Sequence, residues 1–123
     1  MGISSTKIST NGSLASRKVL ITGGMGFIGT AMVEKFVQKY KVTVVDRLDF
    51  GISPAIESLI NNGTVELVTH DLSDSSPIHK RIINGEFDAV VHLAALTHIP
   101  LCESYPAFAY KSNVISFLNV VSN

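Results

Sequence analysis

Apolar and polar positions follow two patterns along the chain, one typical of buried strands and one typical of helices. Short apolar runs bounded by polar or turn residues predict strands at 19–22, 42–45, 65–69 and 89–93. Apolar residues at helical spacing predict helices from 27 to about 40, from 53 to 61, from 77 to about 84, and from Glu103 or Pro106 to Val121. Strands and helices therefore alternate along nearly the whole chain.

This alternation is typical of an α/β domain with a parallel sheet. Right-handed crossovers predict the strand order 3-2-1-4, a partial, Rossmann-like doubly wound sheet of four strands. We expect this domain at residues 17–123, after a disordered polar leader at residues 1–16. Sheets of this kind normally continue with further strands beside the fourth one. These 123 residues predict no such strand, so we expect the outer edge of the apolar fourth strand to be unpaired.

Two helices carry faces that predict their surroundings. On the first helix an apolar stripe is expected to pack on the sheet: Ile28, Met32, Phe36 and Tyr40. The last helix has a polar stripe: Ser112, Ser116, Asn119 and Asn123. Apart from Ser112, which we expect to face a ligand, this stripe is either a solvated face or a face toward a ligand. It also has an apolar stripe: Tyr110, Val114, Phe117 and Val121.

Composition narrows the class of function. The chain has 123 residues, 46% of them hydrophobic, and a formal net charge of zero, so no basic field predicts a nucleic-acid partner. No apolar run reaches the roughly 20 residues of a membrane span. The only cysteine, Cys102, fits a reducing compartment, so we expect a cytoplasmic protein. The start of the chain also matches a myristoylation pattern at Gly2, which stays open beside the polar-leader interpretation.

The most specific chemistry lies in the glycine-rich segment between the first strand and the first helix, residues 22–29. A strand, a glycine turn and a helix in this order predict a site for a dinucleotide pyrophosphate. Gly23, Gly26 and Gly29 allow a sharp turn, a close approach of backbone to phosphate, and tight packing of helix on strand. The helix N-terminus presents free N–H groups and a positive dipole end to the anion.

Asp46, at the end of the second strand, follows Gly29 by 17 residues. A carboxylate at this place can accept hydrogen bonds from the adenosine ribose and repels a 2′-phosphate, which favours NAD over NADP. Arg47 comes next and could instead pair with a 2′-phosphate. NAD is therefore the expected cofactor, and NADP is the less favoured alternative.

From Lys18 to Asn123 the chain resembles the extended short-chain dehydrogenase/reductases, the group of NAD-dependent nucleotide-sugar epimerases and dehydratases. The resemblance rests on four ordered segments: TGGMGFIG at 22–29, Asp71-Leu72, His92-Leu93-Ala94-Ala95 and Ser112-Asn113-Val114. It implies cofactor contacts at Gly23, Gly26, Phe27, Ile28, Gly29, Asp46, Arg47, Asp71, Leu72, Leu93, Ala94, Ala95, Thr97 and Ser112. It also implies a homodimer through the last helix, and a parent reaction like that of UDP-glucose 4-epimerase.

The family's acid–base pair, Tyr-x-x-x-Lys, does not occur in these 123 residues. No tyrosine is followed by a lysine at that spacing: Tyr40, Tyr105 and Tyr110. The four histidines, at 70, 79, 92 and 98, lack zinc-ligand spacing, and His92 in its apolar strand is interpreted as structural. We assign no catalytic and no metal-binding residue, and we expect this chain alone not to catalyse the family reaction.

Three interpretations stay open. In the first, the chain is the NAD-binding N-terminal portion of a nucleotide-sugar epimerase or dehydratase. It would then meet a UDP- or dTDP-sugar only when a C-terminal part is supplied. In the second, it is a standalone, non-catalytic NAD-binding or interaction module. In the third, it is a remnant that does not fold stably.

Overall fold

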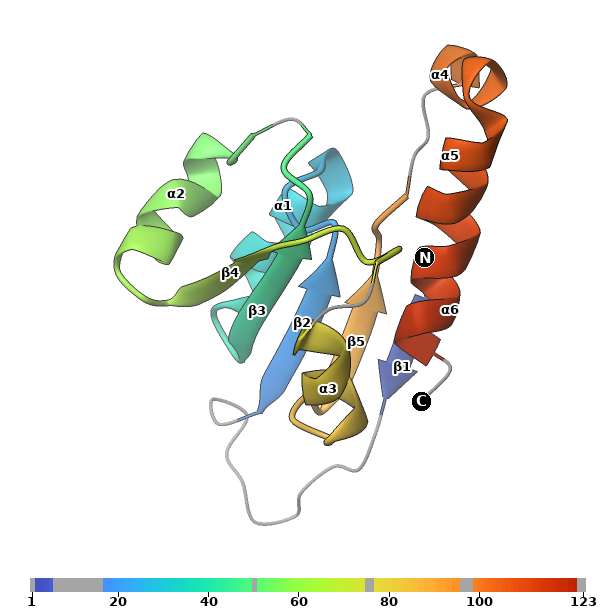
Figure 1. The fold of residues 1–123 in the computed structure, drawn as a ribbon. Helices are drawn as coiled ribbons and strands as arrows, with labels where there is room; N and C mark the ends of the chain where they lie inside the picture. The colour runs from blue at the N-terminus through green and yellow to red at the C-terminus, as the bar shows by residue number, and fades with distance from the viewer. Residues whose placement is uncertain (1, 6–16, 50, 75–76, 96–98, 122–123) are drawn as a thin grey trace.

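The computed structural model describes residues 2–5, 17–49, 51–74, 77–95 and 99–121 (Figure 1). The strands are β1 (Gly2–Ser5), β2 (Lys18–Thr22), β3 (Lys41–Asp46), β4 (Val65–Thr69) and β5 (Ala89–His92). The helices are α1 (Phe27–Phe36), α2 (Pro54–Asn61), α3 (Pro77–Ile83), α4 (Ile99–Ser104), α5 (Pro106–Tyr110), the π-helix η2 (Lys111–Ile115) and α6 (Ser116–Val121).

The strands form one sheet in the order β1-β5-β2-β3-β4. Strands β4, β3, β2 and β5 run parallel to one another, which confirms the predicted order 3-2-1-4 and the Rossmann-like class. Helices α1 and α2 pack on one face of this sheet, and α3 and α6 pack on the other. Ile21 points toward the first face and Leu20 toward the second, and both are fully buried, as in a strand covered on both faces.

Strand β1 corrects two expectations. Gly2–Ser5 runs antiparallel to β5, with Ile3 opposite Val91, so these residues are not a disordered leader and the edge of β5 is not left unpaired. The physical reason is that the N–H and C=O groups along a strand edge need hydrogen-bond partners, which an extended backbone of almost any sequence can supply. The rest of the predicted leader, at 1 and 6–16, lies outside the described residues.

Helix α1 ends at Phe36 rather than near residue 40. Met32, Phe36 and Tyr40 pack against the core as predicted, and the ring of Tyr40 meets Phe36 edge-on with centroids 5.6 Å apart. The prediction was wrong for Ile28, whose side chain is 60% exposed. Ile28 lies in the first turn of α1, at the carboxyl end of the sheet, where the strands no longer cover it.

The last helical segment begins at Ile99, earlier than predicted, and continues from Pro106 to Val121 with a π-helical stretch in its middle. Ser116 is buried, so the solvated-face interpretation of the polar stripe is wrong for this residue, and Ser112, which we expect to face a ligand, is buried too. Asn123 lies outside the described residues. The side chains of the apolar stripe are exposed instead: Tyr110, Val114, Phe117 and Val121.

Candidate functional site

A cleft opens at the carboxyl ends of the parallel strands, between the glycine turn and the last helical segment. Its volume is about 630 Å³, including space open to solvent. It is lined by Gly23, Gly26, Val45, Asp46, Arg47, Asp49, His70, Asp71, Leu72, Leu93, Ala94, Ala95, Ser112 and Ser116. The order of the strands reverses at this place, and doubly wound sheets bind their ligands there.

The glycine turn packs too closely for side chains at two of its positions. Gly23 has a φ of 69°, and a Cβ added to it would lie 2.8 Å from the backbone nitrogen of Ala94. A Cβ on Gly29 would collide with the backbone oxygen of Gly23 and lie 2.7 Å from the Cα of Gly24. On Gly26, which lines the cleft, the nearest atom to an added Cβ would be 3.4 Å away, an ordinary contact. Gly23 and Gly29 therefore shape the turn, while Gly26 keeps its surface open.

The N-terminus of α1 is suited to an anion. Gly26 is the N-cap of this 10-residue helix and has no side chain with which to cap it, and the first turn holds no acidic residue. Helices leave their first N–H groups without intrahelical partners. Uncapped N–H groups and the positive end of the helix dipole together bind phosphate well.

Thr22 joins β2 to the segment after β5, below the cleft. Its buried Oγ1 accepts hydrogen bonds from the N–H groups of Leu93 and Ala94, at 2.9 and 3.2 Å, and lies 2.7 Å from Nδ1 of His92. Because the oxygen already accepts two N–H donors, the hydroxyl donates to Nδ1, and the imidazole is neutral with its proton on Nε2. Burial lowers the pKa of His92, which favours the same neutral form and supports its structural interpretation.

Asp46 points into the cleft from the end of β3 with a fixed orientation. Its Oδ2 accepts a hydrogen bond from the N–H of Met25 at 3.0 Å, and its Oδ1 accepts one from the N–H of Leu48 at 2.7 Å. The left-handed φ of Leu48, 64°, turns the chain that follows it, where the N–H of Gly51 donates to the backbone oxygen of Leu48. A carboxylate has about four acceptor positions, so each oxygen can still accept a ligand hydroxyl.

Asp71 and Leu72 form the side of the cleft beyond β4. Oδ1 of Asp71 accepts hydrogen bonds from the N–H and the hydroxyl of Ser73, at 2.9 and 2.7 Å. Burial favours the neutral acid, but these hydrogen bonds and the charge of Arg47 outweigh it, and the pKa of Asp71 lies below its ordinary value. The backbone oxygen of Leu72 accepts a hydrogen bond from the Asn119 amide at 2.8 Å, which attaches α6 to this segment.

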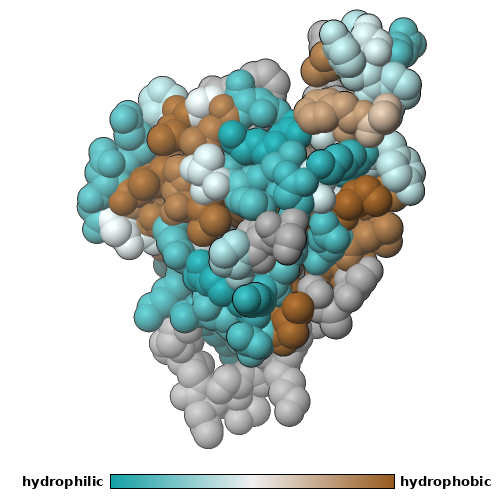
Figure 2. All heavy atoms as spheres, viewed as in Figure 1, coloured by the Kyte–Doolittle hydropathy of each residue, from teal (hydrophilic) through white to brown (hydrophobic). Residues whose placement is uncertain are grey.

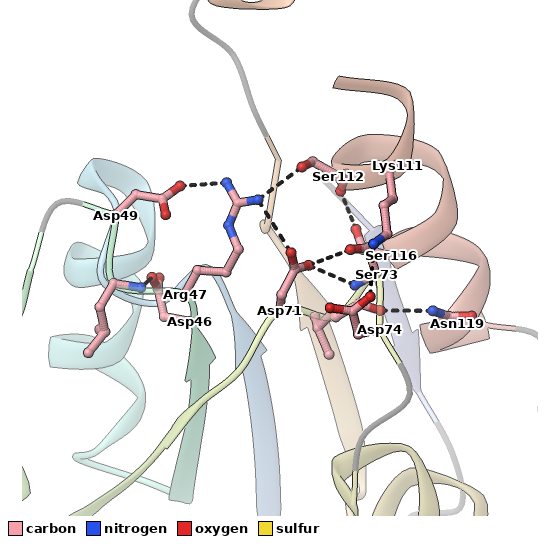
Figure 3. Close-up of polar contacts among 12 residues, drawn as sticks. Asp46, Arg47, Asp49, Asp71, Ser73, Asp74, Lys111, Ser112, Ser116 and Asn119 are labelled. Carbon is pink, nitrogen blue, oxygen red and sulfur yellow. Dashed lines mark hydrogen bonds and ion pairs between the residues drawn. The ribbon is translucent and has the colours of Figure 1, made fainter. Parts of the chain in front are cut away.

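Arg47 reaches across the cleft from β3 toward the last helical segment (Figure 3). Its Nη1 donates to the hydroxyl of Ser112 at 2.9 Å and lies 3.7 Å from Oδ2 of Asp71. Its Nη2 donates to Oδ2 of Asp49 at 2.5 Å, and the guanidinium carbon lies 5.1 Å from the centroid of the Phe108 ring. The guanidinium therefore contacts groups on both sides of the cleft.

Comparison with protein families shows which family this chain belongs to. A family model described as GDP-mannose 4,6 dehydratase matches residues 20–122. The chain belongs to this family. It is 32% identical over 116 residues to the bifunctional UDP-glucose 4-epimerase and UDP-xylose 4-epimerase 3 of Arabidopsis thaliana, an alignment that covers 89% of this chain and 33% of that protein. It is 33% identical over 108 residues to UDP-arabinose 4-epimerase 1 of the same plant, which covers 84% of this chain and 26% of that protein.

Solved structures agree with this family assignment. The UDP-Glc/GlcNAc 4-epimerase of Campylobacter jejuni matches with a TM-score of 0.75 and 30% identity, over 87% of this chain and 33% of that one. A UDP-glucose 4-epimerase from Stenotrophomonas maltophila, solved with bound NAD and formylated UDP-arabinopyranose, matches with a TM-score of 0.72 and 28% identity, over 87% and 33%. The chain thus spans about a third of the length of the relatives that it matches. The resemblance to nucleotide-sugar epimerases is confirmed.

Most of the predicted cofactor residues line the same cleft: Gly23, Gly26, Asp46, Arg47, Asp71, Leu72, Leu93, Ala94, Ala95 and Ser112. Phe27, Ile28 and Gly29 do not line it, since they belong to the first turn of α1, where Phe27 is 97% exposed and Gly29 is buried under the turn. Thr97 lies outside the described residues.

Sequence reasoning missed three residues that line the cleft, Val45, Asp49 and His70, and it left the role of Ser116 open. Val45 and His70 directly precede the predicted site residues Asp46 and Asp71 at strand ends. That position in the sequence could have identified them as residues of the cleft. The partner of Asp49 is Arg47, and that ion pair is visible only in three dimensions.

The described part of the chain offers neither a metal site nor a membrane span. Its His, Cys, Asp and Glu residues form no group of three or more that could hold a metal ion. Its helices are all too short or too polar to cross a bilayer.

Proposed function

We propose that this chain binds NAD in the cleft and is the NAD-binding portion of a nucleotide-sugar epimerase of its family. One observation carries the proposal: the uncapped N-terminus of α1 at Gly26 and the oriented carboxylate of Asp46 line the same cleft. Phosphate-binding N–H groups and a ribose-binding carboxylate are the two parts that a dinucleotide site of this fold needs. The NAD complexes of the epimerases from S. maltophila and Thermus thermophilus support the same cofactor.

The residues present fit NAD along its length. The turn at Gly26 would hold the pyrophosphate, Asp46 the adenosine ribose, and Asp71 and Leu72 the adenine. The segment 93–95 would run along the pyrophosphate and the nicotinamide ribose, because the small side chains of Ala94 and Ala95 leave room beside the backbone. Ser112, whose hydroxyl accepts from Arg47, would face the adenosine half. Bound NAD supplies a hydride acceptor, and the chain's own part is to bind and orient it. We expect no turnover by these 123 residues, which contain no Tyr-x-x-x-Lys pair.

A nucleotide sugar is the proposed substrate of the complete protein, because the named relatives act on UDP-sugars. These relatives do not favour a standalone module, since each carries the matched region within a much longer chain. We also propose a cytoplasmic location, which the single cysteine supports.

Isothermal titration calorimetry with NAD and NADP tests the proposal. We expect saturable NAD binding by the folded wild type, weaker NADP binding, loss of binding in Gly26→Asp, and weaker binding in Asp46→Ala. Gly26→Asp places a negative charge against the pyrophosphate at a position where the fold has room for a Cβ. Ser58→Asp, which adds the same charge to the exposed face of α2, is the matched control. A folded wild type that binds no NAD would overturn the proposal.

The proposal includes a homodimer through the last helical segment. Large apolar side chains are exposed along it: Phe108, Tyr110, Val114, Phe117, Leu118 and Val121. Figure 2 shows apolar surface on the side of the molecule where this helix lies. Exposed apolar patches of this kind mark interfaces, and antiparallel helices can bury them in a bundle.

Sedimentation velocity tests the dimer. The wild type should sediment as a dimer, and Leu118→Lys, at a position 43% exposed, should shift it to a monomer with unchanged circular dichroism. Glu57→Lys on the exposed face of α2 controls for the added charge. A monomeric wild type would contradict this part of the proposal.

A further inference from the structure

Charged groups are distributed unequally along the cleft. The lining includes three carboxylates, those of Asp46, Asp49 and Asp71, and one guanidinium, that of Arg47. Asp46 and Asp71 each have backbone N–H donors, so their charges are already oriented. Asp49 is different: among the described residues, its hydrogen bond and its ion pair both go to Arg47.

The guanidinium of Arg47 is occupied from several directions. Asp49 accepts from Nη2, Ser112 accepts from Nη1, and Asp71 lies near Nη1 (Figure 3). The Phe108 ring also lies against the guanidinium. Arginine binds phosphate through a planar fork of N–H groups, often with two parallel hydrogen bonds. Here both terminal nitrogens already donate to groups of the protein, and two carboxylates offset the positive charge.

We infer that Asp49 is a specificity-determining residue, which excludes NADP by holding Arg47 away from a 2′-phosphate. This inference rests on the proposed function. Asp46 alone repels a 2′-phosphate, but an adjacent free arginine would offset that repulsion. The ion pair with Asp49 removes this compensation, so the chain discriminates twice against the extra phosphate: by the charge of Asp46 and by the engagement of Arg47.

Asp49 rather than Asp71 is the residue to test. The Asp49 carboxylate lies 2.5 Å from Arg47, whereas the nearest Asp71 oxygen lies 3.7 Å away. Asp71 is also held by Ser73 and is part of the proposed adenine site, so its replacement would change several contacts. The Asp49 side chain is 48% exposed, and exposed ion pairs contribute little to stability. Its replacement therefore alters Arg47 with little effect on the fold.

The experiment is a calorimetric comparison of NAD and NADP binding. In Asp49→Asn, NADP should bind at least about tenfold more tightly relative to NAD than in the wild type, because charge-assisted hydrogen bonds to a phosphate become available to Arg47. In an Arg47→Gln background, Asp49→Asn should change the ratio far less, which separates the effect of freeing Arg47 from the loss of one negative charge. Asp49→Glu should keep the preference for NAD.

Asp74→Asn is the matched control, because Asp74 is an exposed carboxylate that pairs with Lys111 and does not line the cleft. It should leave the ratio unchanged. If the wild type binds NAD but Asp49→Asn leaves the NADP-to-NAD ratio unchanged, the inference is wrong and the proposed function stands. An equal gain with and without Arg47 would also overturn it. If the folded wild type binds neither dinucleotide, both fail together.

Discussion

The two walls of the cleft are held in place by different interactions. The glycine turn between β2 and α1 is fixed by backbone packing: Gly23 lies against Ala94, and Gly29 lies against Gly23 and Gly24 with no room for a side chain. The last helical segment meets the opposite side through side chains. Arg47 reaches Ser112, and Asn119 reaches the backbone of Leu72.

This difference separates two tasks of the site. Backbone packing is stiff, so the turn fixes the position of the N-terminus of α1 at the edge of the cleft. The helix wall is held by the packing of Val120 in the core and by side-chain hydrogen bonds worth about 1 to 3 kcal/mol each, contacts that can shift slightly more easily than backbone against backbone. The turn is therefore the stiff wall of the cleft, and the last helical segment is the less rigid, helix wall.

The largest expected effect is at the stiff wall. Gly29→Ala should lower the free energy of unfolding by about 3 kcal/mol, because its Cβ would collide with the backbone of Gly23 and Gly24, which cannot move aside like a side chain. Urea denaturation followed by circular dichroism measures the change. Gly26→Ala is the control, since its Cβ would be 3.4 Å from the nearest atom. Equal losses in the two variants would show that the turn is not held by close packing.

A smaller loss is expected at the helix wall. Asn119→Ala should lower the free energy of unfolding by about 1 kcal/mol, because it removes the hydrogen bond to the Leu72 backbone oxygen. Lys111→Ala removes the pair with Asp74, in which both side chains are more than half exposed, and should leave stability unchanged. The same urea titrations measure both. If Asn119→Ala were as costly as Gly29→Ala, the two walls would be equally rigid.

The stiff wall is also the part that the sequence specified best. Glycine spacing, the apolar run before it and Asp46 after the second strand all act locally, so they predict the strand, turn and helix together. Asn119 and the π-helical stretch belong to the other wall, and their positions depend on contacts with Arg47 and with the segment that follows β4. On that helix the polar and the apolar stripe both follow helical spacing, so the spacing alone does not show which stripe faces the sheet.

Two further features depended on distant parts of the chain. β1 pairs with β5 although 83 residues separate Ser5 from Ala89, and a polar sequence gives no strand signal of its own. Asp49 acquires its role only when Arg47 folds back toward it and Ser112 arrives from the last helical segment. Patterns within a short stretch of sequence do not show such long-range contacts.

The contacts of His92 join β2, which precedes the glycine turn, to the last helical segment. The free energy of unfolding should depend weakly on pH because of this junction. The ring of His92 bonds to Thr22 and contacts the Phe117 ring, and burial lowers its pKa below the ordinary value of 6.5. The unfolded chain therefore binds a proton more readily than the folded chain, so stability falls as pH drops below about 6.5. We expect a loss of at most about 1.4 kcal/mol from this histidine between pH 7.5 and 5.5, which is the limit for a histidine that stays neutral in the folded chain.

Thermal unfolding at a series of pH values measures this loss. His92→Asn should flatten part of the slope, because an amide oxygen can still accept from Thr22 but does not titrate. Burial lowers the pKa of His79 as well, so some slope should remain. An unchanged slope in His92→Asn would contradict the account of this junction.

The smallest effect on global stability is expected at the edge beyond β5. Deletion of residues 2–5 removes the β1 pairing, but the hydrogen bonds lost are nearly offset by the conformational entropy regained. Hydrogen–deuterium exchange should therefore quicken in β5 and stay unchanged in β3, which lies between two other strands. Unchanged exchange in β5 would mean that β1 does not protect this edge.

We propose that the cleft holds NAD with its pyrophosphate on the stiff wall, at the glycine turn. A crystal structure of the chain grown with NAD tests this most directly. We predict the pyrophosphate at the N-terminus of α1 beside Gly26, and the adenosine ribose hydroxyls within hydrogen-bond distance of Asp46. NAD bound elsewhere, or crystals without NAD at a saturating concentration, would contradict the account.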